Sequence, residues 1–561
     1  MKNKAKWSLV LSFVLALSLV LSACGGSGSS QGGKSSNKMA KNQTLNLAIA
    51  QDIPTLDPNL STDTTSTNAI TMTQAGLTRM HNDKYYWDLA AKAPKVSADK
   101  KTVTFKLRDA KWSDGKAITA QDFVYGWQRQ NDPAAKPAYN FLFAAAGIKN
   151  AAEIEDSSNK KMYGKYKELG VKALDDKTLQ VQFNIPVPPF FYSLLSQPQF
   201  LPLREDFVKK QGKKFAQTPS NLLYSGPFIL SKWNKGSSWT YKKNNNYWDA
   251  KTTKLTKVNF QVQKDISTQV NLYKTNKIDA VYKLTGEFVN SLKKSNASEV
   301  HFALNSGTFF LYINQKTNKN LKNLNLRKAI NAAIDRDSFV KVLFNDGSTG
   351  SNYVVPKGFT KGPDGKDFRG DDPVNGYPAG KASDAKKLWN KAKQELGIKT
   401  LKLTFLSADG DQYKQWDAYI ANQIEKNLPG VNVTINQQPW ANYLKLQQEF
   451  KFDLAFSGWF PDYQDPMTYL DMWETGNPQN TTGWSNKEFD QLIEKAKKET
   501  DNPTQRWNDL LKAEKVMMAD YPIVPIYQKG NTWAAKPYVK NLSYPSYGPE
   551  IDFARAYIAQ H

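Results

Sequence analysis

Residues 102–129 read TVTFKLRDAKWSDGKAITAQDFVYGWQR and predict a strand, a turn and a helix in immediate succession. Apolar and polar side chains alternate over residues 102–108, as in a strand with one buried face. The Asp114-Gly115 pair is typical of a hairpin tip. Thr119 is a suitable N-cap for a helix that runs to the end of the stretch. This stretch therefore indicates a chain that mixes strands and helices.

The same patterns recur along the rest of the chain. Predicted strands lie at 44–49, 179–183, 226–230, 239–242, 258–262, 431–435 and 452–456. Predicted helices lie at 267–275, 326–334, 383–396, 411–427, 486–497 and 504–519. Strands interleaved with helices predict α/β layers. A chain of 561 residues exceeds what one core normally spans, so two or three domains are expected.

The N-terminus has the features of a secretory signal. Three lysines precede an apolar run over residues 9–21, and small residues follow it. A transmembrane anchor is the alternative, but such a helix needs roughly 20 apolar residues. Leu-Ser-Ala-Cys at 21–24 resembles the lipobox of bacterial lipoproteins, and Cys24 is the only cysteine. The resemblance implies a signal peptide at 1–23, a lipid on Cys24 and a protein anchored at the outer face of the cytoplasmic membrane. The polar residues of 24–41 predict a flexible tether.

The composition limits the classes of partner that the protein is expected to bind. The formal charge is +24, but the lysines are scattered and no arginine-rich run occurs, so nucleic acid is not expected as a partner. A polyanionic cell wall or simple solubility both account for the charge. The 15 Trp and 26 Tyr fill the core, or in part line a recognition surface.

Residues typical of enzyme active sites are scarce. The three histidines, His81, His301 and His561, are far apart, and no H-E-x-x-H, cysteine cluster or P-loop occurs. We therefore expect no catalysis, no cofactor and no metal site.

Four segments together resemble the oligopeptide-binding lipoproteins of ABC transporters, which form solute-binding protein family 5. They are the opening stretch 102–129, GPFIL at 226–230, LRKAINAAIDR at 326–336 and GWFPDY at 458–463. The similarity runs from about residue 43 to the C-terminus.

The resemblance implies an α/β, two-lobed, periplasmic-binding-protein-like fold of type II with an extra small domain. It implies these boundaries: domain I at 42–85, 215–308 and 528–561, a small domain II at 86–214, and domain III at 309–527. The two lobes would close on a buried ligand.

A receptor for many peptides must bind what all peptides share. The backbone is best bound by strand addition, and the α-ammonium needs an anion shielded from water. By resemblance Asp462 is that anion, and Gly458, Trp459 and Phe460 belong to the ligand-facing segment. By resemblance Trp440 and Tyr125 are candidate walls of the site. The alternatives are an ordinary loop acid for Asp462 and a core role for both aromatic residues.

One departure from the family pattern concerns the ligand carboxylate. Enteric members carry a basic residue three positions before the tryptophan of the 458–463 motif, whereas Phe456 stands here. A carboxylate clamp at that point is therefore absent, and the sequence does not identify a lysine that replaces it.

The sequence thus predicts a monomeric, lipid-anchored receptor that captures oligopeptides and delivers them to the permease subunits of an ABC transporter. A receptor of the same fold for a signalling peptide, a metal chelate or a sugar is one alternative. A cationic cell-surface adhesin is another.

Overall fold

The computed structural model describes residues 38–137, 139–370, 381–499 and 501–561. The predicted signal peptide, Cys24 and most of the predicted tether lie outside these residues. The main feature is one mixed sheet with the hydrogen-bonded order β15-β14-β16-β12-β17-β11-β1-β10-β9-β8, and β13 beside β17. These strands are β1 Thr44–Ile49, β8 Phe228–Asn234, β9 Ser238–Lys243, β10 Lys257–Val262, β11 Ala280–Tyr282, β12 Val300–Ile313, β13 Thr349–Gly350, β14 Leu401–Ala408, β15 Val431–Gln438, β16 Leu454–Trp459 and β17 Ile523–Ala535.

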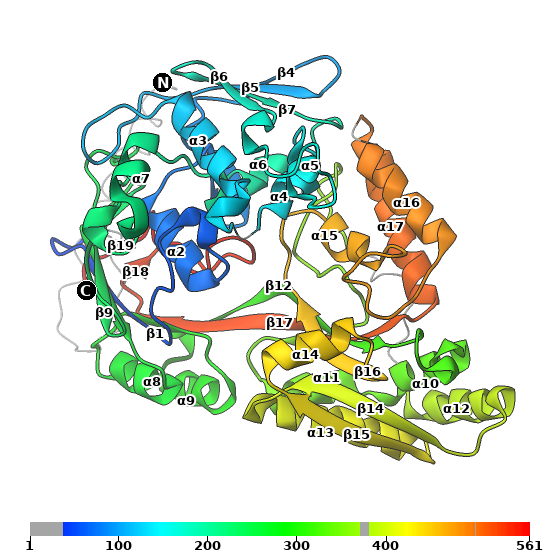
Figure 1. Cartoon of the computed structure of the whole chain (residues 1–561). Coiled ribbons are helices and arrows are strands. Elements are labelled where there is room, and N and C mark those ends of the chain that lie inside the picture. The colour runs from blue at the N-terminus through cyan, green and yellow to red at the C-terminus, as the bar shows by residue number, and fades with distance from the viewer. Residues whose placement is uncertain (1–37, 138, 371–380, 500) are drawn as a thin grey trace, which may run out of the picture.

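Two long antiparallel strands, β12 and β17, join the two halves of this sheet (Figure 1). Residues 300–304 of β12 pair with residues 530–534 of β17, and the ladder resumes where Thr308 pairs with Gln528. The register shifts between these two runs. The ladder is therefore interrupted where both strands cross from one half to the other.

Lobe 1 is the half that carries β8, β9, β10, β1 and β11. Its helices are α2 Thr64–Thr73, α8 Ile266–Lys274 and α9 Gly286–Asn296. Strand β1 lies between two apolar clusters. Leu45 and Leu47 are buried in one cluster, and Ala48 is buried in the other with side chains of α8 and α9. Both faces of β1 are therefore covered, as in a central strand of an α/β sheet.

Lobe 2 is the half that carries β16, β14 and β15. Its helices are α10 Leu324–Ala333, α11 Arg336–Leu343, α12 Ala382–Leu396, α13 Asp411–Asn427, α14 Trp440–Gln448, α15 Met467–Leu470, α16 Lys487–Lys498 and α17 Pro503–Ala519. Leu403 and Phe405 of β14 pack with Ile420 and Ile424 of α13. These parallel strands are thus covered by helices, as expected for an α/β layer.

A small domain sits against both lobes (Figure 1). Its four-stranded sheet has the order β4-β5-β7-β6. Its elements are β4 Lys95–Val96, β5 Thr102–Lys106, α3 Ala120–Gln130, α4 Phe141–Ala145, α5 Ala151–Glu155, β6 Val171–Asp175, β7 Thr178–Gln182, α6 Phe191–Leu194 and α7 Glu205–Gln211. Thr119 and Asp122 form a capping box at the start of α3, with Thr119 N–H donating to Asp122 Oδ2 at 2.9 Å. A further hairpin, β2 Thr78–His81 and β3 Lys84–Trp87, lies before the small domain.

The prediction of α/β layers is confirmed, and the opening stretch forms the strand, turn and helix that its pattern predicted. The strand predicted at 452–456 is wrong at both ends, because β16 extends from Leu454 to Trp459. Neither long crossing strand was predicted. The boundaries predicted after 308 and after 527 fall at neighbouring paired positions of β12 and β17. The domain boundaries stay predictions.

Candidate functional site

A cavity of about 340 Å³ lies where the two lobes, the small domain and the crossing strands meet. Its walls include Thr62 before α2, Tyr139 of the small domain, Asp462 of lobe 2 and Lys529 of β17. A larger cavity of about 760 Å³ lies on another side, between the β2–β3 hairpin and residues 358–367. The smaller cavity is the candidate site because it contains Phe460 and Asp462 of the motif that the sequence singled out.

The loop after β16 positions Asp462 from several directions. The Asp462 N–H donates to Thr468 Oγ1 at 3.1 Å, and the Tyr547 hydroxyl donates to the Asp462 carbonyl at 3.2 Å. Three residues along, the buried Asp465 carboxylate accepts two hydrogen bonds from Arg506 of α17, at 2.8 and 2.9 Å. A bidentate pair of this kind is rigid. The backbone of Asp462 is therefore fixed independently of any ligand.

The Asp462 carboxylate itself is unpaired. No hydrogen bond or ion pair from the described residues reaches it, and only its backbone groups are bonded. Burial, and then repulsion by Asp471, raises the pKa of Asp462 to about 7. A desolvated carboxylate without a counter-charge is costly, and a cation placed against it would remove that cost.

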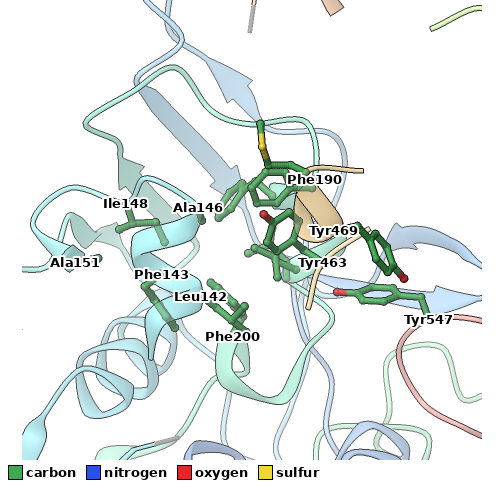
Figure 2. Close-up of a cluster of buried hydrophobic side chains, with 14 of the residues drawn as sticks. Leu142, Phe143, Ala146, Ile148, Ala151, Phe190, Phe200, Tyr463, Tyr469 and Tyr547 are labelled. Carbon is green, nitrogen blue, oxygen red and sulfur yellow. The ribbon is translucent and has the colours of Figure 1, made fainter. Parts of the chain in front are cut away.

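Aromatic side chains enclose this loop (Figure 2). Tyr463, next to Asp462, packs against Phe190 of the small domain, and Tyr469 and Tyr547 lie on the other side of the cluster. The Tyr469 hydroxyl donates to the carbonyl of Ser306 in β12. The Asp462 loop is thus packed against the small domain, a crossing strand and the C-terminal segment.

Strand β16 has an open edge beside the site. It pairs with β12 along its whole length, but with β14 only at residues 454–455. Residues 457–459 therefore have no second strand partner within the part of the chain that the structure describes. Gly458 is required here, because a Cβ atom would lie 2.7 Å from the ring of Phe309. Such an edge can pair with an extended ligand backbone.

Phe460 and Phe456 point to different surroundings. Phe460 is 47% exposed and lines the cavity. Its ring lies over Gly307 of β12, where a Cβ atom would be 2.6 Å away. Phe456 is 1% exposed and packs in the core of lobe 2 near Trp416. Position 456 therefore supplies no charge to the cavity.

Trp440 and Tyr125 lie apart from the cavity lining. Trp440, at the start of α14, is 50% exposed and stacks on Tyr443 with ring centroids 5.1 Å apart. Tyr125 of α3 packs against the lobe 1 cluster. Neither is among the residues that line the cavity. The role of both in binding stays a prediction.

Several lining residues were not found from the sequence. They include Tyr139, Lys283, Lys529, Tyr547 and Glu550. For Lys529 a signal existed, because Gln-Lys-Gly-Asn at 528–531 interrupts an otherwise apolar strand. The others come from loops or short strands whose partners are distant in sequence.

Within the residues that the structure describes, no helix has the length and apolar character needed to cross a membrane. In the same residues, no group of three or more His, Cys, Asp or Glu side chains is placed to bind a metal ion.

Comparisons with known proteins agree on one family. The family described as bacterial extracellular solute-binding proteins, family 5 Middle, matches residues 84–481. The dipeptide-binding protein DppE of Bacillus subtilis (strain 168) is 31% identical over 529 residues, which cover 93% of this chain and 94% of the relative. The substrate-binding domain of an oligopeptide ABC transporter from Bacillus anthracis is 39% identical, with a TM-score of 0.75 over 93% of this chain and 100% of that one.

Another similar structure contains a bound ligand. OppA of Listeria monocytogenes, solved with a bound peptide, is 36% identical with a TM-score of 0.74, over 93% of this chain and 100% of that one. Together with the mixed sheet, these matches confirm the two-lobed periplasmic-binding-protein-like fold. The chain belongs to family 5 of the bacterial extracellular solute-binding proteins.

Proposed function

We propose that this protein captures oligopeptides outside the cell and delivers them to the permease of an ABC transporter for import. The names of its relatives support this, since they are a dipeptide-binding protein, an oligopeptide transporter domain and a peptide-bound OppA. Binding of this kind needs no cofactor, and no bond of the ligand is made or broken.

The observation that carries the proposal is the unpaired carboxylate of Asp462 in a partly buried cavity. Every unmodified peptide presents an α-ammonium group, and an ammonium is the counter-charge that this carboxylate lacks. A charge-assisted hydrogen bond in such surroundings is stronger than one in water.

The peptide backbone would pair with the open edge of β16. Residues 457–459 would supply amide and carbonyl groups, and Phe460 would form a wall next to the first ligand residue. Strand addition binds any sequence, because the groups involved are common to all peptides. Gly458, Trp459, Phe460 and Asp462 are therefore the proposed peptide-binding residues.

The proposal includes the cellular setting predicted from the sequence. A lipid on Cys24 would anchor a monomeric receptor at the outer face of the cytoplasmic membrane. Domains I and III, with the boundaries given above, would close on the peptide, and the closed form would dock on the permease.

The test is a double cycle measured by calorimetry. Asp462→Asn should weaken binding of a free-amine peptide, and N-acetylation of that peptide should weaken binding to the native protein. Removing one partner of a buried charge pair costs roughly 2–5 kcal/mol. Acetylation should matter much less in the variant, because both changes act on one contact. Strictly additive losses would contradict the proposed role of Asp462.

A further inference from the structure

The charged side chains that line the cavity differ in whether they have a bonding partner. Of the five that line it among the described residues, Asp63 caps α2, and Lys283 pairs with Glu550 at 2.6 Å. Asp462 and Lys529 remain. They carry opposite charges, and neither has an ion-pair partner among the described residues. Among the described residues that line the cavity, one carboxyl group and one ammonium group are thus left without an ion-pair partner.

Lys529 lies at the crossing between the lobes. It stands in β17 between Gln528, which pairs with Thr308, and Gly530, which pairs with Leu304. Its ammonium is 5.7 Å from the centroid of the Phe460 ring, near the outer limit of about 6 Å for a cation–π contact. No hydrogen bond from the described residues reaches the Lys529 ammonium.

The environment of Lys529 disfavours a lone positive charge. Burial, and then repulsion by Lys283, lowers the pKa of Lys529. Glu550 and Asp346 offset part of this, but the Glu550 carboxylate already pairs with Lys283, and no described ion pair joins Asp346 to Lys529. An unpaired ammonium in such a place is retained at a cost in stability, which a bound anion would offset.

We propose that Lys529 binds a carboxylate of the ligand, so that the cavity recognises a short peptide by charges of both signs. This inference rests on the proposed function and adds to it the residue that receives the negative group. Position 456 does not serve this purpose, because Phe456 lies in the core of lobe 2. A cavity of about 340 Å³ is at the small end of ligand sites, which suits a peptide of a few residues.

The probes are alanine peptides of two to five residues, as free acids and as C-terminal amides, titrated by calorimetry. For the native protein, the amide of the best-binding length should bind at least about 30-fold more weakly than the acid, because one partner of a buried charge pair is lost. Lys529→Met should bind the free acid correspondingly weakly and no longer distinguish it from the amide. Lys529→Arg, which keeps the charge, should retain the distinction.

A control and a third ligand sharpen the test. Lys232→Met removes an exposed lysine of β8 and should change neither affinity. An alanine-peptide amide with one glutamate tells the two sources of a carboxylate apart. If the native protein binds it more tightly than the plain alanine amide, Lys529 binds an acidic side chain. If it does not, and the free acid binds more tightly than the amide, Lys529 binds the C-terminus.

Stability gives a second measurement. The ligand-free Lys529→Met variant should melt at the same temperature as the native protein or higher, because an unpaired charge is removed. A lower melting temperature would show that Lys529 has a structural partner and would overturn the inference. Equal affinity of the native protein for the acid, the amide and the glutamate-containing amide would overturn it while leaving the proposed function intact. If the native protein binds none of these peptides, the proposed function fails as well.

Discussion

The ring of Tyr463 stacks on the ring of Phe190, with centroids 4.1 Å apart and planes inclined by 22° (Figure 2). Phe190 belongs to the small domain, and Tyr463 belongs to the lobe 2 loop that carries Asp462. The packing of the small domain therefore bears directly on the position of the carboxylate proposed to bind the ligand.

Phe190→Leu should weaken peptide binding. The substitution keeps an apolar side chain but removes the stacked pair, and such pairs contribute about 0.5–1.5 kcal/mol beyond their buried area. The melting temperature should fall, and the affinity should fall by up to about 12-fold in calorimetry with a single peptide, the limit reached if the whole of this energy holds the Asp462 loop in its binding position.

The matched control is Phe143→Leu. Phe143 stacks on Phe200 with centroids 4.3 Å apart, and both residues lie within the small domain. This variant should lower the melting temperature without lowering the affinity. An equal loss of affinity in both variants would show that the Phe190–Tyr463 pair has no special connection to the site.

Asp462→Asn should raise the melting temperature of the ligand-free protein above pH 7. The pKa of an aspartate in an unfolded chain is about 3.9, and that of Asp462 in the folded protein is raised to about 7. Between these values the unfolded chain has released a proton that the folded protein still holds. The native protein therefore loses stability as pH rises through this window, and the loss is complete above it.

The asparagine variant does not titrate at this position. Its advantage in thermal scans should be largest above pH 7 and should disappear as pH falls to about 4. The expected gain is of the order of 1–3 kcal/mol, the cost of one unsatisfied buried polar group. A variant that melts lower than the native protein at pH 8 would mean that the Asp462 carboxylate is stabilised within the protein.

Peptide affinity should depend on pH in a bell-shaped manner. Below about pH 7, Asp462 takes up a proton and loses the charge that binds the ammonium. Above about pH 8, the α-amino group of the peptide loses its own proton. Dissociation constants measured from pH 5.5 to 9 should be lowest between these values. The profile of Asp462→Asn should lack the acidic limb, and an unchanged limb in the variant would assign it to another group.

Gly307→Ala should disturb the site through Phe460. The new Cβ atom would lie 2.6 Å from the ring, so the ring must move. Overpacking of this kind typically costs 1–3 kcal/mol, visible as a lower melting temperature. Phe460→Ala removes the ring, so adding Gly307→Ala to that variant should have little further effect. Additive shifts of the melting temperature would contradict a direct conflict between the two side chains.

Cys24→Ser should abolish membrane anchoring. Cys24 lies outside the described residues, and the prediction rests on the sequence before it. The variant should appear in the medium or as an uncleaved precursor, as seen by cell fractionation and intact-mass measurement. Because a single acyl chain binds a membrane only reversibly, stable retention of the native protein implies at least two chains. Normal processing and retention of the serine variant would refute the prediction.

The sequence predicted local elements better than long-range pairing. Strand β1 and helix α3 follow from alternation and capping, which involve neighbouring residues. Strands β12 and β17 were missed because their burial pattern changes along their length. In lobe 2 each strand is largely buried on both faces, whereas in lobe 1 each is partly accessible. A period of two is not maintained through such a crossing.

The part of the site that lies within a recognisable sequence motif could be predicted. The segment 458–463 identified Phe460 and Asp462, and both line the cavity. Lys529 was not predicted, because its importance depends on its surroundings in the fold. The β12–β17 ladder is interrupted beside it, the carboxylate of Glu550 already pairs with Lys283, and Asp462 lines the same cavity. None of these contacts is local in the sequence.

The position of β17 has a consequence for how the chain assembles. Among the described strands, β17 lies between β12 and β11 in the sheet order, and it begins at Ile523, whereas β12 ends at Ile313. The C-terminus also closes lobe 1, where the N–H of Ala40 donates to the carbonyl of Ile558 at 2.9 Å. Without β17, the backbone of β12 would still connect the two halves, but their strands would not form one hydrogen-bonded sheet. In a newly made chain, the continuous sheet can therefore form only after residues 523–535 have been synthesised and have paired with both β12 and β11.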